Sequence, residues 1–343
     1  MNCCEFCFDD FYIKKFIIQN NETGPCNFCN SQHGQIIYTD LLSSIFLPIC
    51  DLYQEDSEGR YLWNQLNDDW KVFSKQTNKD ELLKKILGEE SQIDLALPYQ
   101  FLSQSLKEKS KKYHENWDEF TRQIKWDNRF QIDLHDGDIN SQNWMVNSFL
   151  ALETTLDKTI QLYRARLNNK PEFYPVDNMG APPKEKVGNG RANPVGIPYL
   201  YLASSCDTAI SEVRPALGQY ICVGNFTIHD SLRLVNLVNI SPFQFHQFNC
   251  EELLPQVSFF RKLSDELSKP ILPSNSNIDY LPTQFLSEMI KRGGWDGIQF
   301  KSCQSSNEDN ESINVILFDP NNAICGEVNL FQTTNIKHDY VTC

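Results

Sequence analysis

The sequence predicts an α+β protein built from three successive parts, because the composition changes twice along the chain. Five of the twelve cysteines fall within the first 29 residues. Residues from about 41 to 155 are rich in Leu, Lys, Glu, Gln and Trp and poor in glycine, as helices are. After residue 155, short runs of Ile, Val, Tyr and Phe indicate strands. We therefore expect three parts, at residues 1–40, 41–155 and 156–335.

The first part contains two Cys-x2-Cys pairs that are eighteen residues apart: Cys4 with Cys7, and Cys26 with Cys29. Each pair can hold one side of a tetrahedral ion, and four thiolates satisfy Zn²⁺ without leaving an open position. The spacing predicts a structural zinc site that stabilises a module too small for a core of its own. Chance cysteines or a redox pair are the alternatives, and Cys3 could replace Cys4. Few basic residues surround the pairs, so a structural or protein-contact role is favoured over nucleic-acid binding.

Two segments of the second part have clear helical patterns. Asp80–Leu87 begins with acidic residues and continues with lysines, as the helix dipole favours. The second segment spaces apolar residues three or four positions apart, which predicts an amphipathic helix with an aromatic face. Its residues are Tyr113, Trp117, Phe120 and Ile124.

The third part alternates predicted strands with predicted helices. The expected strands are 159–167, 199–203, 219–228, 294–302 and 312–318. One helix should follow the capping-like Ser204-Ser-Cys-Asp, and another should start near Pro282 and end at the glycines 293 and 294. Segments rich in Pro, Gly, Asn or other polar residues predict loops at 168–194 and 304–311.

Overall charge and hydropathy exclude several classes of protein. The net charge of −14 argues against a general affinity for nucleic acid or anionic lipid. No apolar run reaches the ~20 residues of a membrane span, and the first residues lack the pattern of a secretory signal. We expect a cytoplasmic protein without membrane contact, whose clustered cysteines bind metal instead of forming a disulfide scaffold. A homo-oligomer is compatible with the sequence.

Arg164 is the first candidate for a ligand-binding residue. Strand alternation places it on the face of Ile160 and Leu162, which is normally the inward face. An inward arginine needs an anion, either a buried carboxylate or a ligand phosphate. An edge strand with solvated arginines is the alternative.

Arg191 and Glu212 are further candidates. Arg191 follows Gly190 in a loop, where glycine permits close backbone approach to a ligand and arginine can bind two phosphate oxygens. Glu212 shares an arc of the expected helix with Ala209, Val213 and Ala216, so its carboxylate needs a partner. That partner is either a structural arginine or a substrate whose positive charge the carboxylate stabilises.

These segments together resemble the RES domain, a family named after its arginine, glutamate and serine. The resemblance covers roughly residues 158–320, and Ala192 stands where the family usually has tryptophan. The matching segments are Leu162–Arg164, Gly190–Gly196, Tyr199–Ser205, Thr208–Glu212, Tyr280–Gln284 and Trp295–Ser302. The first two parts of the chain are similar to a region that is fused to some RES domains and assigned to the HEPN group.

The resemblance implies an ADP-ribosyltransferase-like split β-sandwich that binds NAD⁺ in a cleft. By motif position, Arg164 and Arg191 would bind the phosphates and ribose, and Tyr201 would line the nicotinamide site. Glu212 would hydrogen-bond the nicotinamide ribose, and Ser302, which alone looks like an ordinary turn serine, would complete the opposite wall. The implied activity is cleavage of NAD⁺ by hydrolysis or phosphorolysis, in a toxin or defence effector with a neutralising antitoxin or gating partner. Protein ADP-ribosylation is the alternative.

Two other functions compete with this interpretation. Arg129 and His135 have the spacing of a HEPN ribonuclease pair, although the acidic charge disfavours RNA. A sensor without enzymatic activity is the third hypothesis, and the joint presence of the five candidate residues speaks against a degenerate cleft. A thiol nucleophile has no obvious histidine partner, so we interpret Cys206, Cys222 and Cys303 as buried or incidental.

Overall fold

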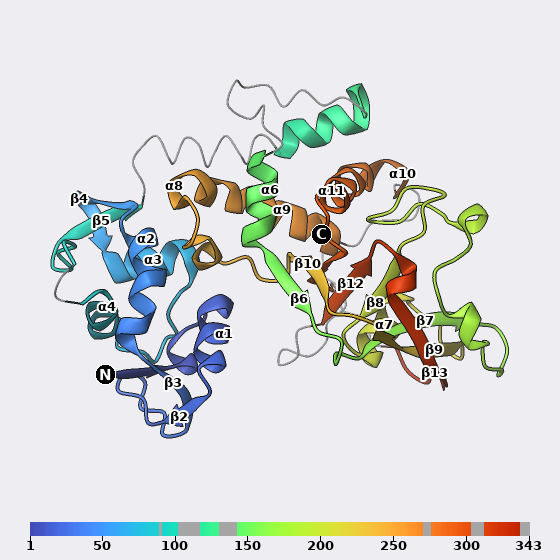
Figure 1. Ribbon diagram of the computed structural model, residues 1–343, viewed down its shortest axis with the longest axis horizontal. Coiled ribbons are helices and arrows are strands. Elements are labelled where there is room, and N and C mark those ends of the chain that lie inside the picture. Colours follow the sequence, from blue (N-terminus) through green and yellow to red (C-terminus); the bar gives the residue numbers. More distant parts are fainter. Residues whose placement is uncertain (89–90, 102–116, 130–142, 270–275, 303–311, 337–343) are drawn as a thin grey trace. The chain divides into compact units, whose positions relative to one another are not determined.

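A computed structural model describes most of the chain and divides it into two compact units (Figure 1). It describes residues 1–343 except 89–90, 102–116, 130–142, 270–275, 303–311 and 337–343. The N-terminal unit comprises residues 1–117 and 239–260, and the C-terminal unit comprises residues 118–238 and 261–343. The three-part division at residues 40 and 155 remains a prediction.

The N-terminal unit combines short helices with two small antiparallel sheets, which have the strand orders β1-β3-β2 and β4-β5. Its elements are β1 (Asn2–Cys4), η1 (Glu5–Cys7), α1 (Phe11–Gln19), β2 (Glu22–Gly24), β3 (Gly34–Tyr38), η2 (Thr39–Leu42), α2 (Ser43–Cys50), β4 (Tyr53–Tyr61), α3 (Leu62–Trp70), α4 (Lys79–Leu87), β5 (Pro98–Phe101), η6 (Pro242–Phe245), α8 (Cys250–Leu253) and η7 (Leu254–Gln256).

The helical expectation for residues 41–155 is confirmed at α4 and is wrong at β4 and β5. Helix α4 begins after Asn78, whose side chain accepts a hydrogen bond from the amide of Glu81. Strand β4 has no alternating apolar pattern, because Tyr53 is its one buried residue. Without that alternation, the sequence gives no strand signal at this place.

Aromatic packing explains why residues 239–260 belong to the N-terminal unit. The rings of Phe8, Phe46 and Phe73 pack against one another with centroids 5.8–6.2 Å apart. Phe243 joins this cluster, with its ring centroid 4.8 Å from that of Phe46. These four buried rings form an aromatic cluster within the core of the unit.

The C-terminal unit is built around one large sheet. Residues 118–122, at the start of this unit, are helical and precede its labelled elements. These are η3 (Gln123–Asp127), α6 (Asn143–Ala151), β6 (Glu153–Leu156), β7 (Leu162–Asn168), η4 (Val176–Asn178), η5 (Lys184–Lys186), β8 (Leu200–Ala203), α7 (Cys206–Glu212), β9 (Tyr220–Ile228), β10 (Leu232–Asn236), the end of α9 (Val257–Ser268), α10 (Ser276–Asp279), α11 (Leu281–Arg292), β11 (Gly297–Lys301), β12 (Ile313–Leu317), η8 (Pro320–Asn322) and β13 (Ala323–Gln332).

The large sheet has eight strands in the order β13-β9-β7-β8-β12-β11-β10-β6. The β10–β11 pair is parallel and the other pairs are antiparallel. Strand β7 pairs with β9 along its whole length, from Leu162 to Asn168. The structure describes both β7 and β8 in full, and one residue pair, Tyr163 with Ala203, makes up their register. The sheet therefore opens between β7 and β8.

The predicted strands of the C-terminal region are confirmed as β7, β8, β9, β11 and β12, with small shifts at their ends. The predicted helices are confirmed as α7 and α11. Ser205, one residue after the expected start, accepts the hydrogen bond from the Thr208 amide that begins α7. Strand β13 was not predicted, because a bulge between Cys325 and Val328 interrupts its alternation. The predicted loop at 304–311 lies outside the described residues.

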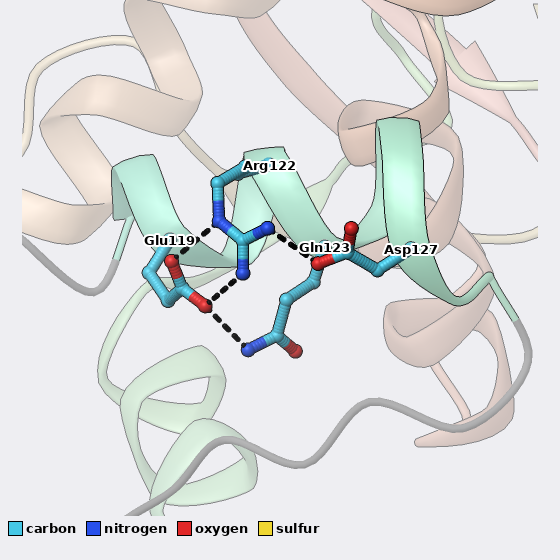
Figure 2. Close-up of polar contacts among 4 residues, drawn as sticks. All are labelled: Glu119, Arg122, Gln123 and Asp127. Carbon is cyan, nitrogen blue, oxygen red and sulfur yellow. Dashed lines mark hydrogen bonds and ion pairs between the residues drawn. The ribbon is translucent and has the colours of Figure 1, made fainter.

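The predicted aromatic helix is confirmed where it is described: Trp117, Phe120 and Ile124 are buried, whereas Tyr113 lies outside the described residues. The helix ends in the π-helical turn η3. Figure 2 shows the exposed side of this turn, where Arg122 donates to Glu119 and Asp127, and Gln123 donates to Glu119. Exposed ion pairs of this kind contribute little to stability.

Candidate functional site

A pocket of about 260 Å³ lies at the opening between β7 and β8. Both strands contribute to its wall, and so do the loop before β8 and the end of α7. The polar residues that line it are Tyr163, Arg164, Arg191, Tyr201, Glu212 and Asn314. The structure thus brings four of the five predicted site residues to one pocket, although Arg164 and Glu212 are 48 positions apart in the sequence.

Arg164 has the inward orientation that strand alternation predicted. Its Nη1 donates a hydrogen bond of 3.3 Å to the main-chain carbonyl of Tyr201. Burial, with a smaller contribution from Arg166, lowers the pKa of Arg164 to about 10, so the guanidinium remains charged at neutral pH. No carboxylate in the described part of the chain forms an ion pair with it. Its described hydrogen-bond partner is therefore a main-chain carbonyl and not a buried carboxylate.

Tyr201 is fixed by the loop that precedes β8. Its hydroxyl donates to Oδ1 of Asn193 at 2.8 Å and accepts from the amide of Ala192 at 3.1 Å. Burial raises the pKa of Tyr201 to about 12. A Cβ atom at Gly190 would collide with Asn193 Oδ1 and lie 2.6 Å from the Tyr201 hydroxyl. Gly190 is therefore required for close approach of the loop to Tyr201; close approach of this glycine to a ligand stays a prediction.

Helix α11 holds the same loop from the other side. Nε2 of Gln284 donates to Asn189 Oδ1 and to the carbonyls of Gly190 and Asn193, at 2.7 to 3.0 Å. Thr283 donates its hydroxyl hydrogen to the carbonyl of Arg191 at 2.5 Å. Both side chains are buried. The Thr-Gln pair of the sequence motif thus shapes the loop that carries Arg191.

Arg191 lines the pocket, but part of its guanidinium is already bonded to the protein. Nη1 donates to the carbonyls of Leu267 and Lys269 at the end of α9, at 2.7 and 2.5 Å. The group also lies over the ring of Tyr280, 6.0 Å from its centroid. Carbonyls at a helix C-terminus attract cations, so this contact orients the arginine. The expectation that Arg191 binds phosphate is untested and remains a proposal.

Glu212 is the last residue of α7, which corrects part of the sequence argument. Ala216 lies beyond the end of the helix, so the predicted apolar face of the helix does not include it. Oε1 of Glu212 accepts hydrogen bonds from Ser302 Oγ at 2.5 Å and from Asn314 Nδ2 at 2.7 Å. Ser302 is 3% exposed and is not on the pocket wall, so it supports Glu212 from behind.

Sequence reasoning missed Asn314 and Asn193, and it quoted Gln284 without assigning a role. Asn314 is the one polar residue in the apolar run Ile313–Leu317, and this was the signal that could have found it. Among the cysteines considered as nucleophiles, Cys222 is fully buried and Cys206 is half-buried. Cys303 and His135 lie outside the described residues, and Arg129 is exposed.

The four predicted metal-ligating cysteines converge in the N-terminal unit. The Sγ atoms of Cys4, Cys7, Cys26 and Cys29 all lie within 4.8 Å of one another, and three of these residues are buried. In a tetrahedral ion with Zn–S bonds of about 2.3 Å, sulfurs are about 3.8 Å apart, so this arrangement fits one metal ion. The amide of Phe28 donates to Cys26 Sγ at 3.3 Å, as amides near metal-bound thiolates do.

The family of the chain follows from a comparison with family models, because residues 161–330 match the model described as the RES domain. The chain belongs to the RES-domain family through these residues. The match extends from the start of β7 to within β13 and contains every lining residue named above. The RES domain therefore includes the opening of the sheet.

A solved structure similar to part of this chain is the crystal structure of the M. tuberculosis MbcT-MbcA toxin-antitoxin complex. The similarity covers 56% of this chain and 94% of that chain, with 14% sequence identity and a TM-score of 0.33. No curated protein matches the sequence. Among the described residues, no helix is both long and apolar enough to span a membrane.

Proposed function

We propose that the RES domain cleaves the bond between nicotinamide and ribose in NAD⁺, and so depletes NAD⁺. The observation that carries this proposal is the pocket itself, which combines a carboxylate, a tyrosine and a partly buried arginine that has no carboxylate partner among the described residues. A dinucleotide offers a matching set of groups: a pyrophosphate for the arginine, ribose hydroxyls for the carboxylate and an aromatic ring for the tyrosine. The pocket volume of about 260 Å³ is slightly below that of typical clefts, about 300–1,000 Å³, so the pocket would enclose one end of the dinucleotide.

The chemistry of this bond requires little more than these groups. The nicotinamide ring of NAD⁺ carries a positive charge. It leaves as a neutral molecule that takes the bonding electron pair, and the ribose becomes oxocarbenium-like. The Glu212 carboxylate stabilises that positive charge, because it is held at a fixed place before the charge develops. Arg164 and Arg191 hold the pyrophosphate. Binding of this distant group fixes the orientation of the ribose carbon at which the bond breaks.

The acceptor that completes the reaction is water or phosphate. Attack of water on the ribose carbon gives ADP-ribose, nicotinamide and a proton. Attack of phosphate gives the 1-phosphate of ADP-ribose, and transfer to a protein side chain is the alternative. The split between β7 and β8 supports an ADP-ribosyltransferase-like fold, because it places the cleft within the sheet.

For the N-terminal unit, we propose a structural role for Zn²⁺ bound by Cys4, Cys7, Cys26 and Cys29. Four thiolates leave no position for substrate, so this metal supports folding. An enzyme that depletes NAD⁺ harms its host, which implies an antitoxin or a gate. The N-terminal unit is our candidate for the gate.

Product analysis tests the proposed function. Purified protein is incubated with NAD⁺, with and without phosphate, and the products are separated by chromatography. We expect nicotinamide release, with ADP-ribose or its 1-phosphate as the second product, and loss of release in Glu212→Gln. Glu327→Gln is the matched control, because Glu327 is exposed on β13. Wild-type protein that releases no nicotinamide, or equal activity in Glu212→Gln, would contradict the proposal.

A further inference from the structure

The two carboxylate oxygens of Glu212 have different surroundings. Oε1 accepts both hydrogen bonds, from Ser302 and from Asn314. No described residue donates a hydrogen bond to Oε2. Glu212 also lines the pocket, so one oxygen is bound by the protein and the other is available to a ligand. This asymmetry gives the carboxylate a defined orientation.

The two donors reach Oε1 because adjacent strands present them side by side. In the register of β11 with β12, Phe300 pairs with Asn314 and Lys301 pairs with Ile313. The amide of Ser302 extends this ladder by donating to the carbonyl of Ser312 at 2.8 Å. Side chains of strands are fixed by their backbone, so the sheet sets the positions of both donors.

Glu212 needs this support because of its place in α7. As the last residue of the helix, it lies near carbonyl groups that carry partial negative charge, which disfavours a carboxylate. Two hydrogen bonds from neutral donors offset that repulsion and leave the charge in place. Asn314 differs from Ser302 in that it also lines the pocket.

We propose that Asn314 is a positioning residue of the NAD⁺-cleaving site. Together with Ser302, it fixes Glu212 through Oε1, so that Oε2 alone receives a hydroxyl of the nicotinamide ribose. This inference rests on the proposed function. Ser302 has the same positioning role, because it is buried, does not line the pocket and donates its hydroxyl hydrogen to Glu212.

The test measures kcat and KM for nicotinamide release from NAD⁺ in two variants of the full chain. Asn314→Ala removes the donor, and loss of one hydrogen bond to a charged group predicts a fall in kcat of about 10- to 100-fold. KM should change less than about threefold, because the arginines that bind the pyrophosphate are unchanged. Asn314→Asp keeps the size of the side chain but replaces the donor by a second carboxylate. We expect an even larger fall in kcat in this variant, since like charges then face each other.

Asn329→Asp is the matched control, because Asn329 is exposed on β13 of the same sheet, and its kcat should equal that of the wild type. Thermal unfolding of each variant shows whether a loss of activity comes from misfolding or from a displaced Glu212 carboxylate in a folded protein. If Asn314→Ala does not fold, the isosteric Asn314→Asp decides the question. An active wild type whose Asn314 variants keep kcat, or raise KM alone, overturns this inference and leaves the proposed function standing. An inactive wild type overturns both.

Discussion

Tyr163 of β7 pairs with Ala203 of β8, and this pair alone joins the two strands in the register. Beyond it, Arg164 extends from β7 to the carbonyl of Tyr201 on β8 and takes the place of a strand-to-strand hydrogen bond. Paired strands lie about 4.8 Å apart and leave no room between them for a ligand. The separation of β7 from β8 is what creates the pocket, and the side chains at this separation should control activity.

Arg164→Met should abolish nicotinamide release without lowering the melting temperature. Burial lowers the pKa of Arg164 to about 10, so below that pH the folded protein bears the full cost of burying a charge that no described carboxylate pairs with. Methionine fills similar space without the charge. Differential scanning fluorimetry should show a melting temperature equal to or above that of the wild type, while chromatography shows no product.

The control for this variant is Arg292→Met, because Arg292 is exposed at the end of α11. Inorganic pyrophosphate should raise the melting temperature of wild-type protein and of Arg292→Met, but not of Arg164→Met. At a concentration of 100 times its Kd, a ligand stabilises the folded state by about 2.7 kcal/mol. Equal stabilisation of all three proteins would exclude Arg164 as the anion-binding group.

Gly190→Ala should lower activity at least tenfold, whereas Gly188→Ala should be neutral. The added methyl group at 190 collides with Asn193 and approaches the Tyr201 hydroxyl, and relief of such overpacking costs about 1–3 kcal/mol. A methyl group at 188 meets no atom within 4 Å. Nicotinamide release and thermal unfolding, measured on both variants, check this. Similar losses at the two positions would mean that general loop flexibility, and not contact with Tyr201, limits activity.

Cys26→Ser should release the metal of the N-terminal unit. Wild-type protein should contain about one zinc ion per chain by elemental analysis, since four thiolates make one closed tetrahedral site. The serine variant should contain little zinc and be cleaved faster by protease within residues 1–117, because metal binding is coupled to folding. Cys206→Ser is the control and should keep its metal. Full zinc content in Cys26→Ser would show that the metal, if present, lies elsewhere.

Local sequence patterns predicted the individual strands and helices of the RES domain. Runs of β-branched and aromatic residues gave β7, β8 and β9, and strand alternation gave the inward orientation of Arg164. The motifs that carry the family resemblance gave the residues of the pocket. Resemblance was needed because each motif alone has an ordinary structural interpretation.

Contacts between distant residues could not be predicted from local patterns. Glu212 and Asn314 are 102 positions apart, and their hydrogen bond depends on the register of β12 with β8 and β11. The bond of Arg191 to Leu267 similarly depends on where α9 ends. The helical stripe through Ala216 failed for a related reason, because periodicity does not show where a helix stops.

The return of residues 239–260 to the N-terminal unit has a practical consequence for dissecting this chain. No single cut separates the two units, because a fragment that starts at residue 118 still contains Phe243, whose ring packs on Phe46. Such a fragment would expose an aromatic segment that has lost its core and would tend to aggregate. Loss of activity on truncation would then report insolubility and not the removal of a gate. Point variants in the intact 343-residue chain, or a deletion that replaces 239–260 by a short linker, avoid this outcome.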